Sequence, residues 1–138
     1  MAISDLLPRK AMGSKTRGQT LHDRLDYDQK KEKTEDGELV SSYMCCPETA
    51  AEEFEMSKLI YETSTGRSQP KDRDIIAYRI IQSFKPGEIT PEEANKLGYE
   101  LAMKFTKGKH QFVVSTHVDK AHIHNHVEFN STNLECDG

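Results

Sequence analysis

The sequence lacks long apolar runs. No stretch approaches the ~20 apolar residues that a membrane-spanning helix needs, and no apolar signal-peptide core opens the chain. Hydrophobic residues make up 35% of the 138 residues and the mean hydropathy is −0.76, so the chain is polar for an enzyme. We therefore expect a cytoplasmic protein of one domain, either thin or with a large working surface.

Cysteine is scarce as well. The three cysteines are Cys45, Cys46 and Cys136, an odd number with one adjacent pair. This pattern is not that of a secreted disulfide framework, and it lacks the Cys-x-x-Cys spacing of a zinc site. We expect reduced thiols.

Basic residues are nearly missing from two stretches of the chain. The net charge is −4, and residues 35–57 contain seven acidic residues without one Lys or Arg, while residues 115–138 contain four against one Lys. Residues 1–34, in contrast, carry eight basic residues against five acidic ones. The net charge of −4 argues mildly against a nucleic-acid partner. A site that holds a divalent cation tolerates acidic surroundings, so charge alone decides nothing.

Histidine is what the chain does have. Five of its six histidines lie between His110 and His126. If the residues after Ala121 form a strand, alternate side chains share a face. One face would then carry His122, His124, His126 and Glu128, and the other Ile123, Asn125, Val127 and Phe129. Two imidazoles on one strand and a third from a neighbour make an open metal site. The alternative is a solvated strand that is rich in histidine.

Periodicity and turn residues predict helices that alternate with strands, and no repeat is present. We expect helices at 21–27, 47–62 and 90–107, and strands at 39–45, 75–84, 111–116 and from 122 onward. Residues 9–20 are polar, basic and glycine-bearing, which predicts a mobile loop, and residues 28–38 predict a solvated connection. This order of elements predicts an α+β fold in which helices pack on one face of a mainly antiparallel sheet.

The motif His117-x-Asp119-x-x-x-x-His124-x-His126 resembles the third motif of conjugative relaxases, the mobilisation nucleases of the HUH endonuclease superfamily. Residues 74–95, 106–110 and 126–132 resemble further segments of that family, so the resemblance covers about residues 20–136. The chain departs from the family at Asn125, where a bulky apolar residue is usual, and at Lys30-Lys31, where Asn-Pro is commoner.

The resemblance implies a site-specific and strand-specific nuclease that nicks single-stranded DNA at a transfer origin. Its nucleophile would be Tyr27, which becomes linked to the 5′ phosphate. Its metal ligands would be His117, His124 and His126, holding Mg²⁺ or Mn²⁺. Nitrogen ligands also favour Zn²⁺ or Ni²⁺, which we expect in a purified sample. The implied partners are the origin DNA and accessory relaxosome proteins, and the implied fold is the HUH, ferredoxin-like sandwich.

Several nearby residues have open roles. Asp119 either fixes a ligand histidine, lies close enough to aid Tyr27, or caps the turn between two strands. Glu128 lies on the ligand face, whereas His110 and His122 are expected spectators. DNA phosphates are expected to meet Arg9, Lys10, Lys15 and Arg17, with Arg79 or Lys85.

Two alternative hypotheses remain. A zinc hydrolase with a His-x-His site and a water nucleophile would not need Tyr27. An inactive relaxase remnant would bind DNA without cleaving it. We expect residues 1–138 to be a single relaxase domain, truncated at the C-terminus and the N-terminal fragment of a longer protein.

Overall fold

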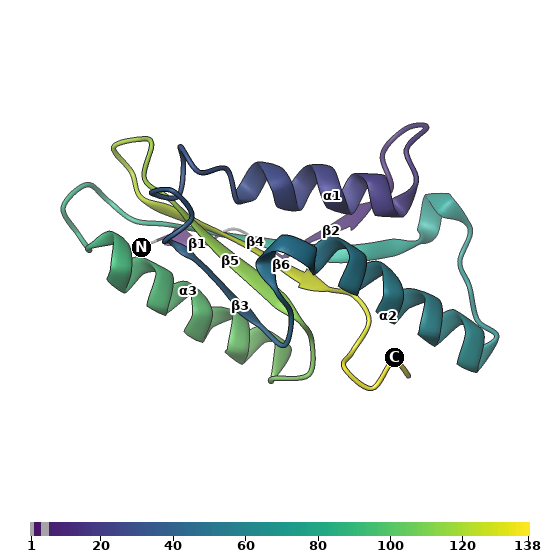
Figure 1. Cartoon of the computed structure of the whole chain (residues 1–138). Coiled ribbons are helices and arrows are strands. Elements are labelled where there is room, and N and C mark those ends of the chain that lie inside the picture. Colours follow the sequence, from purple (N-terminus) through teal and green to yellow (C-terminus); the bar gives the residue numbers. More distant parts are fainter. Residues whose placement is uncertain (1, 4–5) are drawn as a thin grey trace.

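The computed structural model describes residues 2–3 and 6–138, and they form one antiparallel sheet with helices against it (Figure 1). The strands are β1 (Ala2–Ile3), β2 (Leu7–Lys10), β3 (Val40–Tyr43), β4 (Ile75–Ser83), β5 (Phe112–His117) and β6 (His124–Asn130). β1 and β2 pair with opposite ends of β4 and share one edge, so the order across the sheet is β1/β2–β4–β6–β5–β3. The predicted α+β class and the antiparallel sheet are confirmed.

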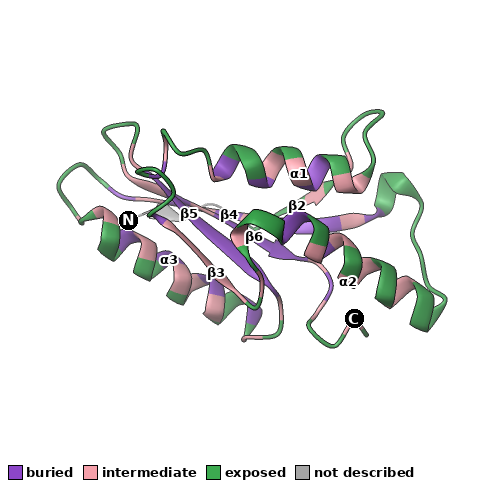
Figure 2. Cartoon of the chain, in the orientation of Figure 1, coloured by how far each residue is buried: buried purple, intermediate pink, exposed green. Residues whose placement is uncertain are grey.

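The helices pack on both faces of the sheet. They are α1 (Arg17–Asp28), α2 (Ala50–Thr65) and α3 (Pro91–Thr106), with short 3-10 turns η1 (Pro47–Thr49) and η2 (Lys71–Arg73). Val113, on one face of β5, packs with residues of α1 and α2, whereas Val114, on the other face, packs with α3. The prediction that all helices lie on one face is therefore wrong. Both faces of the central strands are buried, and no single apolar stripe in the sequence reports that (Figure 2).

The first helix begins earlier than its apolar pattern indicates. Thr16 caps α1 by accepting from the backbone N–H of Gln19, while the Gln19 side chain accepts from the backbone N–H of Thr16. This capping box fixes the helix start at Arg17. Residues 9–10 belong to β2 and residues 17–20 to α1, so the predicted mobile loop over residues 9–20 is only a short connection.

The central strand β6 begins at His124 rather than at residue 122. It pairs with β4 on one side and with β5 on the other, and its register places His124 opposite His117 and His126 opposite Ser115. Residues 118–123 form the turn between β5 and β6. The histidine strand is thus shorter than predicted, but its alternation is as expected.

Asn125, between two histidines of β6, is fully buried under α3. Its Oδ1 accepts from Thr116 Oγ1 at 2.5 Å, and its Nδ2 donates to Ala94 O at 2.7 Å and to Gln82 Oε1 at 2.8 Å. A Cβ at Gly98 would lie 2.6 Å from Asn125 Nδ2, so α3 approaches the sheet this closely only because residue 98 is glycine. These bonds explain why the position holds an amide rather than a bulky apolar residue.

Among the described residues, no helix is both long enough and apolar enough to cross a membrane.

Candidate metal and nucleophile site

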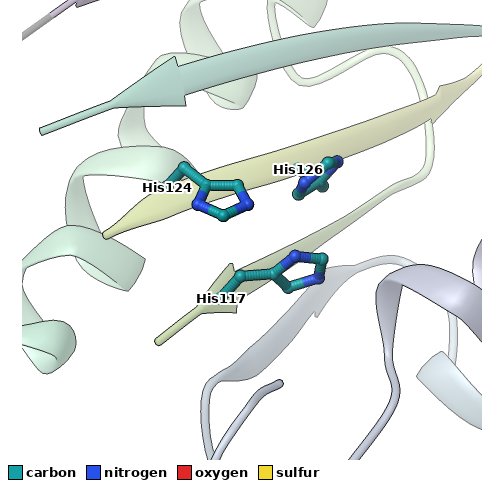
Figure 3. Close-up of side chains that lie close together, drawn as sticks. All are labelled: His117, His124 and His126. Carbon is teal, nitrogen blue, oxygen red and sulfur yellow. The ribbon is translucent and has the colours of Figure 1, made fainter. Parts of the chain in front are cut away.

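Three histidines converge on the sheet face that α1 and α2 cover. His117 comes from the end of β5, and His124 and His126 come from the start of β6 (Figure 3). The ring centroids of His117 and His126 are 4.2 Å apart, and His124 lies 5.0 Å from each. One nitrogen from each ring lies within 4.8 Å of the others, so all three can bind one ion.

The second nitrogen of each ring faces an oxygen. His117 Nε2 lies 2.7 Å from the backbone O of Asp28, and His124 Nδ1 lies 3.1 Å from the backbone O of His122. His126 Nδ1 lies 3.6 Å from Asp28 Oδ1, just beyond hydrogen-bond distance. The acceptors at His117 Nε2 and His124 Nδ1 favour tautomers in which His117 Nδ1 and His124 Nε2 carry the lone pairs. The arrangement suits metal binding.

Burial favours the neutral form of two of the three histidines. It lowers the pKa of His117, and it lowers the pKa of His126 to about 3, where the neighbouring imidazoles act in the same direction. Neutral imidazoles are the form that binds metals. Three neutral nitrogen ligands with open positions fit a divalent cation that keeps its full charge toward a substrate.

Tyr27 lies in the last turn of α1, beside the histidines. Its ring centroid is 6.5 Å from that of His117 in an edge-on arrangement, and 45% of the residue is exposed. Three of the other tyrosines have packing roles. Tyr43 donates to the backbone O of Gly108, Tyr78 stacks on Phe129, and Tyr99 packs against Phe112. Tyr27 is thus an exposed phenol beside the triad.

Asp119 contacts a lysine. Its carboxylate accepts from Lys33 Nζ at 2.8 Å, which lowers the pKa of Asp119 and raises that of Lys33. Lys33 Nζ in turn lies 5.3 Å from the centroid of the Tyr27 ring. The acceptors beside the second nitrogens of the histidines come from Asp28 and His122, so Asp119 is linked to the tyrosine through Lys33.

Asp28 is a site residue that the sequence interpretation missed. It is buried beneath the triad and faces two of the three ligands, His117 through its backbone O and His126 through its carboxylate. Burial raises the pKa of Asp28 to about 7, although the charges of Arg9 and Arg79 oppose the shift. The sequence did carry a signal, because Leu21, Leu25 and Asp28 follow the spacing of one helical face, which places the carboxyl toward the core.

Comparison with known proteins identifies the family of the chain. A family model described as the MobA/VirD2-like nuclease domain of relaxases matches residues 22–137. The chain belongs to this relaxase family. It is 43% identical over 95 residues to the protein rlx of Staphylococcus aureus, covering 69% of this chain and 27% of that protein. It is 41% identical over 81 residues to the group II intron-interrupted relaxase LtrB of Lactococcus lactis subsp. cremoris, covering 54% of this chain and 14% of that protein.

The chain therefore spans about a quarter or less of the length of these relatives. No solved structure gives a significant match to it.

The two remaining histidines of the cluster lie away from the triad. His110 Nδ1 lies 2.8 Å from Asn130 O, and its ring packs on Phe129, away from the triad. His122 is exposed and contacts His124 through its backbone O. Both lie outside the triad, as expected.

Two arginines of the predicted DNA contacts are committed to ion pairs. Arg9 pairs with Glu128, which is 2% exposed. Arg17 donates to Glu55, Glu62 and Asp74, and so joins α1 to α2 and to the start of β4. Both guanidinium groups neutralise buried or half-buried carboxylates, and the contact of Arg9 and Arg17 with DNA phosphates stays a prediction.

Proposed function

We propose that this chain carries the nicking activity of a relaxase: metal-dependent, strand-specific transesterification of single-stranded DNA at a transfer origin, with Tyr27 as nucleophile. One observation carries the proposal. The exposed Tyr27 ring lies 6.5 Å from the ring of His117, a member of the three-histidine site. A phenol and a metal site this close can act on one phosphate.

The reaction exchanges one phosphate ester for another. Tyr27 Oη forms the new bond to phosphorus, and the bond from phosphorus to the 3′ oxygen of the preceding nucleotide breaks. The phenol gives up its proton, and the departing 3′ oxygen takes one up. Because the phosphotyrosine keeps the bond energy, the same residues can rejoin the ends. The exposure of Tyr27 gives a strand access to its oxygen.

The protein's own part is to position the groups. His117, His124 and His126 would hold a divalent cation, which when bound supplies positive charge at a nonbridging phosphate oxygen. Asp28 orients His117 through its backbone O, and its carboxylate lies 3.6 Å from His126 Nδ1. We propose Mg²⁺ or Mn²⁺ as the ion in cells. Zn²⁺ or Ni²⁺ is expected after purification because nitrogen ligands favour softer ions.

The proposed partners follow from this activity. They are single-stranded origin DNA and the accessory proteins of a relaxosome, met in the cytoplasm. That residues 1–138 form the N-terminal nuclease domain of a longer relaxase stays a prediction, in keeping with the small share of the relatives that the chain matches.

A covalent-trapping experiment tests the proposal. The protein is incubated with Mn²⁺ and a labelled single-stranded transfer-origin oligonucleotide, then separated under denaturing conditions. We expect an adduct that survives denaturation, is lost with EDTA and is absent from Tyr27→Phe. Tyr61→Phe is the matched control, since Tyr61 lies on α2 away from the triad, and it should form the adduct normally.

The alternatives give different results. A zinc hydrolase would cut the oligonucleotide without an adduct, and Tyr27→Phe would cut equally well. A relaxase remnant would bind the oligonucleotide and leave it intact. Either outcome would refute the nicking activity.

A further inference from the structure

Two lysines lie over the proposed nucleophile. Lys30 Nζ is 5.2 Å and Lys33 Nζ 5.3 Å from the centroid of the Tyr27 ring, within the range of cation–π contact. Lys33 is partly buried, with 18% of its side chain exposed, whereas Lys30 is exposed. The tyrosine thus lies beneath two ammonium groups.

Lys33 is held in this position from a distant part of the chain. Its ammonium donates to Asp119 at 2.8 Å, and its backbone O accepts from the N–H of Val118 at 2.8 Å. These two bonds fasten residues 30–33, which follow the nucleophile, to residues 118–119, which follow the ligand His117. A long lysine side chain loses rotamer freedom when it is ordered, so two bonds at this residue indicate a preferred geometry.

The local charge near the tyrosine opposes the charge of the whole chain. The net charge of −4 repels a polyanion, and Arg9 and Arg17 are paired with carboxylates of the protein. At the ring, Lys30 Nζ and Lys33 Nζ both lie within 5.3 Å of the Tyr27 centroid, and Lys33 also donates to the Asp119 carboxylate. A positive site therefore lies where a phosphate must approach the phenol.

We propose that Lys33 contacts the phosphodiester attacked by Tyr27, that Lys30 adds a second ammonium contact to the same strand, and that Asp119 is the positioning residue that keeps Lys33 over the ring. The ligand is an anionic phosphodiester of single-stranded DNA, and the inference rests on the proposed function. Asp119 then acts through Lys33, without contact to the substrate.

The salt dependence of binding tests the Lys33 contact. Fluorescence anisotropy with a labelled single-stranded origin oligonucleotide is recorded over a series of KCl concentrations. Each phosphate contact to a single strand contributes about 0.7 to the slope of log K against log salt. Lys33→Gln should lower the slope by about that amount, Lys30→Gln should lower it too, and Lys33→Arg should restore it.

Lys104→Gln is the matched control. Lys104 lies on α3, on the opposite side of the sheet, and its loss changes the net charge equally. Equal slopes for Lys33→Gln and Lys104→Gln would overturn the contact. Thermal melts show whether each variant folds. If Lys33→Gln does not fold, the salt slope of Lys30→Gln, at an exposed position, tests whether the ammonium groups over the ring contact the strand.

Asp119→Asn tests the positioning role separately. It removes a negative charge near the strand, so binding should be as tight as in wild type or tighter. The rate of adduct formation at saturating DNA should fall about tenfold, because Lys33 is no longer held over the ring. In a Lys33→Gln background, Asp119→Asn should cause no further loss. An unchanged rate in Asp119→Asn, or additive losses in the double variant, would refute it.

Failure of this inference differs from failure of the proposed function. If wild type binds the oligonucleotide without forming an adduct, the proposed nicking activity is refuted, while the salt slopes still test the Lys33 contact. If wild type forms the adduct and Lys33→Gln has the same salt slope as Lys104→Gln, only the Lys33 contact is refuted. If wild type binds no DNA, the nicking activity and the Lys33 contact are both refuted.

Discussion

The two faces of the sheet differ in how they treat buried polar atoms. On the α3 face, the buried amide of Asn125 is hydrogen-bonded through both of its polar atoms, amid an apolar core around Phe112. Buried side-chain atoms without hydrogen-bond partners among the described residues gather on the histidine face, at Asp28, Arg79, Ser115 and His126, whereas the α3 face has Ser41, which lies opposite Val114. Each such atom costs about 1–3 kcal/mol. One face supplies stability, and the other holds groups ready for a ligand.

Phe112 should show the largest stability effect. It is fully buried, stacks on Tyr43 and meets Tyr99 edge-on, so Phe112→Ala should lower the free energy of unfolding by about 3–5 kcal/mol in urea denaturation. The matched variant on the histidine face is Ser115→Ala, which removes a buried hydroxyl without a partner. That change should be neutral or slightly stabilising. A large loss of stability in Ser115→Ala would contradict the difference between the two faces of the sheet.

Asp28 is expected to lower the stability of the fold while it strengthens metal binding. Burial raises the pKa of this carboxyl from 3.8 to about 7, so between those pH values the folded chain holds a proton that the unfolded chain has lost. Stability therefore falls as the pH rises through this window. Asp28→Asn cannot ionise, so its stability should match that of wild type at pH 4 and should exceed it increasingly as the pH rises to 8.

The same substitution, Asp28→Asn, should weaken metal binding. Calorimetric titration with Mn²⁺ should show about 10–100-fold weaker binding in Asp28→Asn, because an amide orients His126 less well than a carboxylate. The lowered pKa values of His117 and His126 act in both proteins and cancel in the comparison. Equal stability at pH 8 together with unchanged affinity would contradict the assigned role.

Two glycines give the smallest effects, of opposite sign. A Cβ at Gly98 would lie 2.6 Å from Asn125 Nδ2 and 2.7 Å from Val114 Cγ1, so Gly98→Ala should cost about 1–2 kcal/mol. At Gly18 in α1 the nearest atom is 4.0 Å away, so Gly18→Ala should stabilise by about 0.5 kcal/mol through helix propensity. If both changes had the same sign in thermal melts, the close approach of α3 would be wrong.

Much of the site could be predicted from the sequence because its signals are local. The alternation of β6 places His124 and His126 on one face, and the short turn after β5 brings His117 beside them. Tyr27 came from the family resemblance. No local pattern could report that Lys33 reaches Asp119, since that contact spans 86 positions of the chain.

The errors in the fold have physical causes. The start of α1 was missed although Thr16 and Gln19 have capping-box spacing, because the residues around them are polar. The predicted loop over residues 9–20 includes the end of β2, because an edge strand of four residues, with Pro8, gives little β signal. Helices on both faces were missed because Asn125 and Thr116 break the apolar pattern of the α3 face while hydrogen-bonding inside it.

The central claim is that one metal site lies beside Tyr27. Fluorotyrosine incorporation and ¹⁹F NMR test it directly, with Tyr27→Phe to assign the signal. Stoichiometric Mn²⁺ is predicted to broaden the Tyr27 signal more than that of Tyr99, which lies on α3 across the sheet, and His124→Ala should abolish the difference. Equal broadening of both signals, or selective broadening that persists in His124→Ala, would contradict the account.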